Sequence, residues 1–192
     1  MISRIKRLWH NEQSLQGATW LLVVTMVLSN GLGFLRDVIL ANALPLGVLD
    51  TYYAAFRLPD FLFNLFILGA ISSAFIPVFL DLQAQDGESA SWRLAHNLIH
   101  IALAILAVLG LLLFIFMPAI LPYFVPGFDS VKLAQTVPLA RTLLLSPIFF
   151  AISYVLGGVL NAHKKFFAYA LAPLVYNLSI IVGGFLSPWF GV

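Results

Sequence analysis

Residues 17–43 read GATWLLVVTMVLSNGLGFLRDVILANA, an apolar stretch that contains one adjacent pair of opposite charges, Arg36 and Asp37. A helix of about 20 residues crosses a hydrocarbon core of ~30 Å, so this stretch is long enough to span a membrane. An ionised side chain at bilayer depth costs roughly 2.5–3.5 kcal/mol even on lenient scales. Such groups normally face a cavity, a partner or a substrate pathway, so the pair predicts a functional position.

The composition of the chain indicates an integral membrane protein. Of its 192 residues, 61% are hydrophobic and only 9% are charged, whereas roughly 25% are charged in an ordinary soluble domain. The chain has no cysteine, which excludes disulfides and thiolate metal sites. The net charge of +2 is too small to indicate a nucleic-acid partner.

Five uncharged runs are long enough to cross the membrane, and each is predicted to be a helix because lipid cannot satisfy free backbone groups. We therefore predict an all-α polytopic membrane protein with about five transmembrane helices, preceded by a cytoplasmic segment at residues 1–16. The spans are expected near residues 17–43, 51–82, 95–124, 133–162 and 166–190. The chain stops after an odd number of spans, so we expect it to be a fragment of a longer protein.

Basic residues predict the orientation of these spans. Arg4, Lys6 and Arg7 precede the first span, and the sequence HKK at residues 163–165 connects the last two. Because Lys and Arg are in excess in cytoplasmic loops, the N-terminus is expected in the cytoplasm. A cleavable signal peptide is disfavoured, since the first apolar run exceeds the ~7–15 residues of such segments.

Arg36 and Asp37 differ in spacing from a second pair, Arg57 and Asp60. Residues three apart share a helical face, so Arg57 and Asp60 could simply neutralise each other, and that interpretation stays open beside a functional one. Neighbouring residues point about 100° apart on a helix. Arg36 and Asp37 are therefore not expected to satisfy each other easily, and at least one should need a ligand or a partner on another helix.

Other chemistries lack a supporting pattern. The glycines at residues 31–33 are not followed by the third glycine of a dinucleotide site, and no Walker-type sequence occurs. His96 and His100 are four residues apart, but no acidic residue lies between them, so no metal site is predicted. We expect no cofactor and no enzymatic activity. For Arg141, contact with the lipid headgroups is favoured over a place in a transport cavity.

Arginines in a membrane cavity suit an anionic substrate. The guanidinium group binds phosphate bidentately and stays charged at any relevant pH. We therefore expect Arg36 and Arg57 to hold an anionic head group, while the neighbouring aspartates orient them or compete with the cargo and help its release.

Three motifs closely resemble the N-terminal part of the MurJ (MviN) lipid II flippase family. They are SNGLGFLRD at residues 29–37, DTYYAAFRLPD at 50–60 and GAISSAFIPV at 69–78, and the resemblance extends over about residues 29–181. It implies a fold of the multidrug/oligosaccharidyl-lipid/polysaccharide (MOP) exporter superfamily, with fourteen helices in two lobes around a central cavity. This chain would form roughly the first five helices of the N-lobe.

The resemblance also implies a function in cell-wall biogenesis and cell shape. A lipid-linked oligosaccharide flippase would carry the peptidoglycan precursor lipid II across the bacterial cytoplasmic (inner) membrane by alternating access. Cell-wall synthesis proteins and a coupling ion are further expected partners. The residues expected to bind substrate are Arg36, Arg57 and Asn30, and those expected to act in coupling or gating are Asp37, Asp50 and Asp60.

The chain departs from the family pattern in its basic residues. Asn30, Phe63 and Asn64 stand where the family usually carries basic side chains. The cavity is thus expected to be poorer in cations, and Arg36 is the cation on which head-group binding most depends.

Two other functions stay open. A cation-coupled multidrug exporter of the same superfamily would use carboxylates such as Asp37 as its binding groups. A non-transporting membrane scaffold subunit would use the charges only to pair its helices.

Overall fold

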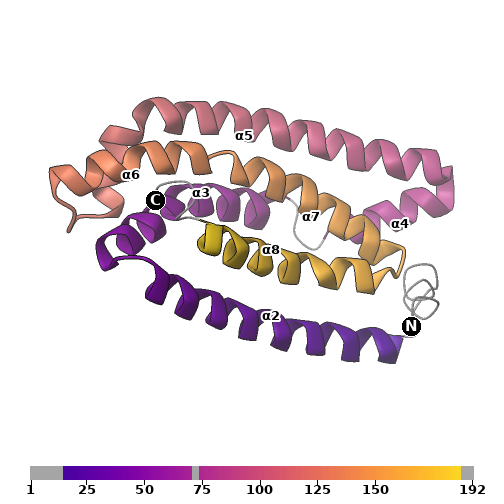
Figure 1. Cartoon of the computed structure of the whole chain (residues 1–192). Helices are drawn as coiled ribbons and strands as arrows, with labels where there is room; N and C mark the ends of the chain where they lie inside the picture. The colour runs from indigo at the N-terminus through magenta and orange to yellow at the C-terminus, as the bar shows by residue number, and fades with distance from the viewer. Residues whose placement is uncertain (1–14, 71–73, 187–192) are drawn as a thin grey trace. The chain divides into compact units, whose positions relative to one another are not determined.

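The computed structural model describes residues 15–70 and 74–186, and these residues form helices joined by short connections, without any strand among them (Figure 1). The prediction of an all-α protein is confirmed. The predicted cytoplasmic segment at residues 1–16 lies, except for its last two residues, outside the described residues. The helices are α2 (Leu15–Ala43), α3 (Leu46–Ala70), α4 (Phe75–Asp86), α5 (Glu88–Phe124), α6 (Ser130–Leu143), α7 (Ser146–Ala162) and α8 (Phe166–Leu186).

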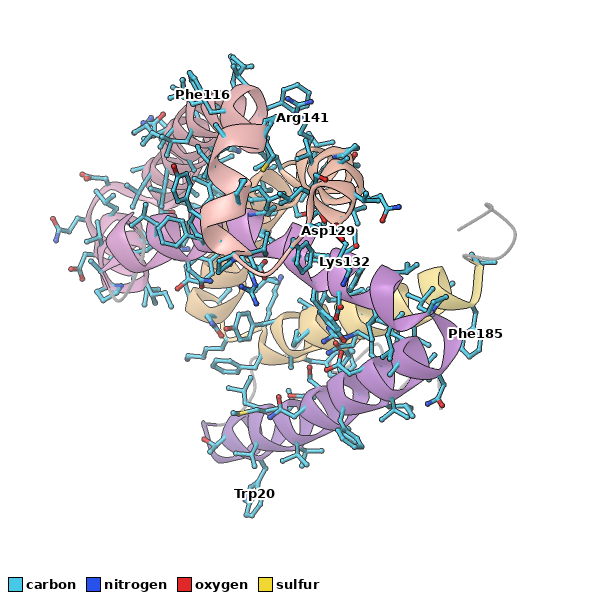
Figure 2. The ribbon with its side chains drawn as sticks, turned by 90° about the vertical axis from the view of Figure 1, so that its left-hand side faces the viewer. Trp20, Phe116, Asp129, Lys132, Arg141 and Phe185 are labelled. Carbon is cyan, nitrogen blue, oxygen red and sulfur yellow. The ribbon has the colours of Figure 1, made fainter. Side chains whose placement is uncertain are left out.

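Four helical segments within the described residues are long and apolar enough to cross a membrane. They are Thr19–Ala43, Glu88–Phe124, Ser130–Ala162 and Phe166–Leu186. Large apolar side chains are exposed on them, and Trp20 on α2 is 72% exposed and projects away from its helix (Figure 2). Such surfaces suit contact with lipid, and the chain is a multi-pass membrane protein.

The stretch predicted as a second span, residues 51–82, is divided between α3 and α4, and residues 71–73 between them lie outside the described residues. The helix α3 carries three charges, Asp50, Arg57 and Asp60, and is not among the four apolar segments. The arrangement of five spans therefore stays a prediction.

The chain divides into two compact units, one formed by residues 1–49 and 160–192 and the other by residues 50–159. In the first unit α2 packs along α8. A glycine allows this approach, because a Cβ placed on Gly184 would lie 2.9 Å from Cδ2 of Leu40. Small residues at helix contacts let backbones come close in membrane proteins.

The second unit has a core in which α3, α5 and α6 meet. Its members combine small alanines with larger aliphatic side chains, and Met117 and Leu121 are completely buried. The buried residues of this core are Ala54, Ala55, Leu58, Met117, Leu121, Val125, Ala140 and Leu144. The same unit holds a close contact between α7 and α4, since a Cβ on Gly158 would lie 2.8 Å from the ring of Phe75.

Local sequence explains where α6 begins and where it gives way to α7. Asp129 caps α6, because its Oδ1 accepts a hydrogen bond from the backbone N–H of Lys132 at 2.8 Å. Figure 2 shows these two residues next to each other at the start of the helix. Leu144 and Leu145 interrupt the helix. Pro147 then lies in the first turn of α7, where its missing N–H costs nothing.

Candidate functional site

Arg36 on α2 makes hydrogen bonds to two acceptors on two helices. Its Nε and Nη2 lie 2.9 and 2.8 Å from Oδ1 of Asp37, and its Nη1 donates to Oδ1 of Asn177 on α8 at 3.0 Å. The expectation that Arg36 and Asp37 cannot easily satisfy each other was wrong, because the long arginine side chain reaches across the angle between neighbouring positions. The expectation of a partner on another helix is confirmed.

Asn177 joins the two helices at this point. Its side-chain amide donates to the carbonyl and hydroxyl oxygens of Ser29, each at 3.2 Å, and to the carbonyl of Pro173 at 3.1 Å. Asn177 and Ser29 are both buried. We call Ser29, Arg36, Asp37 and Asn177 the α2–α8 polar cluster.

The charges of this cluster are only partly shielded. The side chain of Arg36 is 21% exposed and that of Asp37 is 48% exposed. The guanidinium group is thus held in a fixed position by its acceptors, while about a fifth of the Arg36 side chain stays exposed. An anion that approaches this part would compete with the Asp37 carboxylate for the same donors.

Sequence reasoning did not include Asn177 among the site residues. A signal was present, because Asn177 is an isolated amide within the apolar span of residues 166–190 and follows Pro173 by one helical turn. A polar side chain in a transmembrane helix is commonly hydrogen-bonded to a neighbouring helix. The sequence alone could not show that α2 supplies that partner.

Arg57 on α3 has a different environment. Its Nη1 donates to the carbonyl of Phe124, the last residue of α5, at 2.6 Å. The final carbonyls of a helix lack partners within the helix and carry the negative end of its dipole, so a cation stabilises them. Within the described part of the chain the Asp60 carboxylate takes part in no ion pair or hydrogen bond, so Arg57 and Asp60 do not neutralise each other.

Asp50 and Arg57 line one pocket although they lie two turns apart on α3. The pocket has a volume of about 320 Å³, and Lys132 and residues 125–128 complete its lining. Nζ of Lys132 donates to Oδ2 of Asp50 at 3.1 Å. The pocket therefore contains two cations and one anion.

The predicted site residues are divided between the two units. Asn30, Arg36 and Asp37 belong to the first, whereas Asp50, Arg57 and Asp60 belong to the second. Asn30 is exposed, and its side chain has no hydrogen bond to another described residue. No three His, Cys, Asp or Glu side chains come together as metal ligands within residues 15–70 and 74–186.

Comparison with known proteins finds the same family over most of the chain. The family model described as lipid II flippase MurJ matches residues 40–190. The "Lipid II flippase MurJ" of Thermosipho africanus is 37% identical over 174 residues, which are 84% of this chain and 33% of the relative. The "Probable lipid II flippase MurJ" of Rhizobium tropici is 31% identical over 163 residues, which are 83% of this chain and 31% of the relative. No solved structure matches the chain.

The chain spans about a third of the length of the curated relatives that it matches. The family match begins just after Asp37 and includes all of the motifs at residues 50–60 and 69–78. The family match also agrees with the helical membrane fold described above. Because the match covers far more than half of its residues, the chain belongs to the lipid II flippase MurJ family.

Proposed function

We propose that this chain forms part of a flippase that carries lipid II across the bacterial cytoplasmic membrane, and that Arg36 contacts the pyrophosphate of the cargo. The observation that carries the proposal is the geometry of Arg36, whose guanidinium is bonded to Asp37 and Asn177 and whose side chain is partly exposed. A cation held in place loses little side-chain entropy when it binds an anion.

The position of Asp37 supports a role in release. Asp37 accepts from two donors of Arg36, so a bound phosphate would exchange with this carboxylate instead of meeting an unpaired cation. Such an exchange limits the affinity, and a carrier needs its cargo to dissociate after transport. We assign to Asp37 the orientation of Arg36 and the competition with the head group.

The pocket at Asp50 and Arg57 supports a supplementary role. Arg57 would assist in holding the head group, and Asp50, which is paired with Lys132, would act in gating. Asp60 would act in coupling to an ion, and Asn30 would contribute a polar contact to the substrate. No covalent step is needed, since alternating access moves the head group while the polyprenyl tail stays in lipid.

The remaining features of the proposal concern the cell. We place the N-terminus in the cytoplasm because Arg4, Lys6 and Arg7 precede the first span. The cytoplasmic membrane is the expected location, and cell-wall synthesis proteins are the expected partners of the complete transporter.

Complementation tests the proposal. A bacterium depleted of its own lipid II flippase would receive the complete gene that encodes this chain, as wild type or with Arg36→Ala. We expect the variant to fail while its membrane level stays normal. Arg93→Ala, which removes an exposed arginine from α5, is the matched control and should support growth. Growth of the Arg36→Ala strain at the wild-type rate would refute the role of Arg36.

The other two functions predict different results. A cation-coupled drug exporter would show dye efflux that depends on Asp37 and not on Arg36. A scaffold subunit would lose stability with Arg36→Ala and regain it with any pair of side chains that restores the link between α2 and α8.

A further inference from the structure

A second pocket lies on the surface of the unit formed by residues 50–159. It is a groove of about 660 Å³ between α5, α6 and α7. Its apolar walls include Leu111 and Phe114 of α5 together with Leu145 and Ile148. Among the described residues that line it, Arg141 alone is charged. Gly110 also lines the groove, and a Cβ placed on it would meet nothing within 4 Å.

Arg141 is held at the edge of this groove by α5. Its Nε donates to the carbonyl of Phe114 at 2.8 Å, and its guanidinium carbon lies 4.7 Å from the centre of the Phe114 ring. Figure 2 shows Arg141 beside α5. Among the described residues no carboxylate pairs with Arg141, and its terminal N–H groups have no acceptor. A fixed cation with free donors therefore borders an apolar groove.

The depth of Arg141 in the bilayer follows from sequence distances. On α5, Phe114 lies about 20 residues after Arg93, which corresponds to ~30 Å along the helix and to the thickness of the hydrocarbon core. After Arg141 the chain has no charged residue until Lys164, again more than 20 residues away. Both helical segments thus place Arg141 at a boundary of the hydrocarbon core, where lipid phosphates lie.

We propose that this groove binds an anionic phospholipid of the surrounding bilayer, with its phosphate on Arg141 and one acyl chain along the apolar walls. Charge complementarity selects the head group, because a guanidinium without an acid partner binds phosphate strongly. Basic pockets between transmembrane helices are known to bind lipid head groups. The site uses residues of α5, α6, α7 and the turn between α6 and α7, and it is separate from the residues assigned to the cargo.

Native mass spectrometry of the complete, detergent-purified transporter tests the site. Phosphatidylglycerol would be titrated against the wild type and Arg141→Gln, and phosphatidylcholine would serve as the zwitterionic probe. We expect Arg141→Gln to weaken the tightest phosphatidylglycerol binding about tenfold and to abolish the preference over phosphatidylcholine. Arg93→Gln should leave both unchanged. Equal binding by the wild type and Arg141→Gln would overturn the proposal.

A second variant tests the groove separately from the charge. Gly110→Leu would place a bulky side chain in the groove from a position where an added Cβ meets nothing within 4 Å, and it should also weaken phosphatidylglycerol binding about tenfold. Gly183→Leu is the matched control, because Gly183 is exposed on α8 and its Cβ would likewise meet nothing. Unchanged melting temperatures would show that both variants fold. If Gly110→Leu bound the lipid like wild type, Arg141 would only contact headgroups at the surface, and the groove would not be a lipid site.

Discussion

The α2–α8 polar cluster and the core of α3, α5 and α6 hold their helices together by different interactions. In the cluster, Asn177 links the helices through hydrogen bonds to Ser29 and Arg36. In the core, Met117 and Leu121 are completely buried among apolar neighbours. The cluster thus depends on hydrogen bonds, whereas the core depends on the close packing of apolar side chains.

The difference shows where charge is placed in this protein. Lipid is as apolar as a leucine side chain, so the hydrophobic effect contributes little to the association of helices in a bilayer. Packing and hydrogen bonds therefore determine which helices associate. In the unit of residues 50–159 Arg57 binds the end of a helix and Asp50 pairs with an exposed lysine. In the other unit the charges of Arg36 and Asp37 are part of the contact between two helices.

The largest expected effect is in the apolar core. Met117→Ala removes a completely buried side chain and leaves a cavity, so the free energy of unfolding should fall by about 2–5 kcal/mol. The matched control is its neighbour Phe116→Ala, because Phe116 is 54% exposed and should be nearly neutral. Melting temperatures of the purified transporter in detergent measure both. Equal losses would contradict the assignment of the core.

The next effect concerns the polar cluster. Asn177→Leu keeps the approximate size of the side chain and deprives both Arg36 and Ser29 of a partner. Because buried donors and acceptors are then unsatisfied, we expect a loss of about 1–3 kcal/mol, measured by the same unfolding experiment. Asn42→Leu is the control, since within the described residues the Asn42 amide bonds only to the Val38 carbonyl of its own helix. A variant at Asn177 as stable as the one at Asn42 would show that the cluster does not hold α2 to α8.

A smaller effect is expected where α7 approaches α4. Gly158→Ala would place a methyl group against the Phe75 ring, and such overpacking costs about 1 kcal/mol or more. Gly110→Ala should instead be neutral or stabilising, because its Cβ has free space and alanine favours a helix. Restoration of the melting temperature by Phe75→Leu in the Gly158→Ala background would confirm the contact. An additive loss in the double variant would argue against it.

The smallest effect is expected at the ion pair of Asp50 and Lys132. Both side chains are well exposed, at 55% and 37%, and exposed ion pairs contribute only about 0.2–1 kcal/mol. Asp50→Asn should therefore change the melting temperature little at low salt and not at all at high salt. A large loss at both salt concentrations would mean that Asp50 has a structural role beyond this pair.

Much of the fold follows from composition and run length, because long uncharged runs in lipid have to be helices. The helices α2 and α5 were expected for this reason. The interruption at Leu144 and Leu145 was not, since both residues are apolar and the uncharged run passes through them without a break.

The site was predictable only in part. Arg36 was identified by the cost of a charge in an apolar stretch, whereas its contact with Asp37 depends on a side-chain conformation that spacing on a helix does not determine. The partner role of Asn177 depends on a helix more than a hundred residues away in the sequence. Spacing suggested that Arg57 could pair with Asp60, but Arg57 instead donates to the carbonyl of Phe124. This choice of acceptor depends on the packing of α3 against the end of α5, which spacing along the chain does not determine.

Direct binding of a polyprenyl pyrophosphate tests the central claim that Arg36 is the main head-group cation. The complete transporter in lipid nanodiscs would be titrated with this ligand as wild type, Arg36→Gln and Arg57→Gln. We predict that Arg36→Gln weakens binding by about tenfold or more, because charged hydrogen bonds are worth about 1.5–3 kcal/mol, and that Arg57→Gln has a smaller effect. Wild-type affinity of the folded Arg36→Gln protein would contradict the claim.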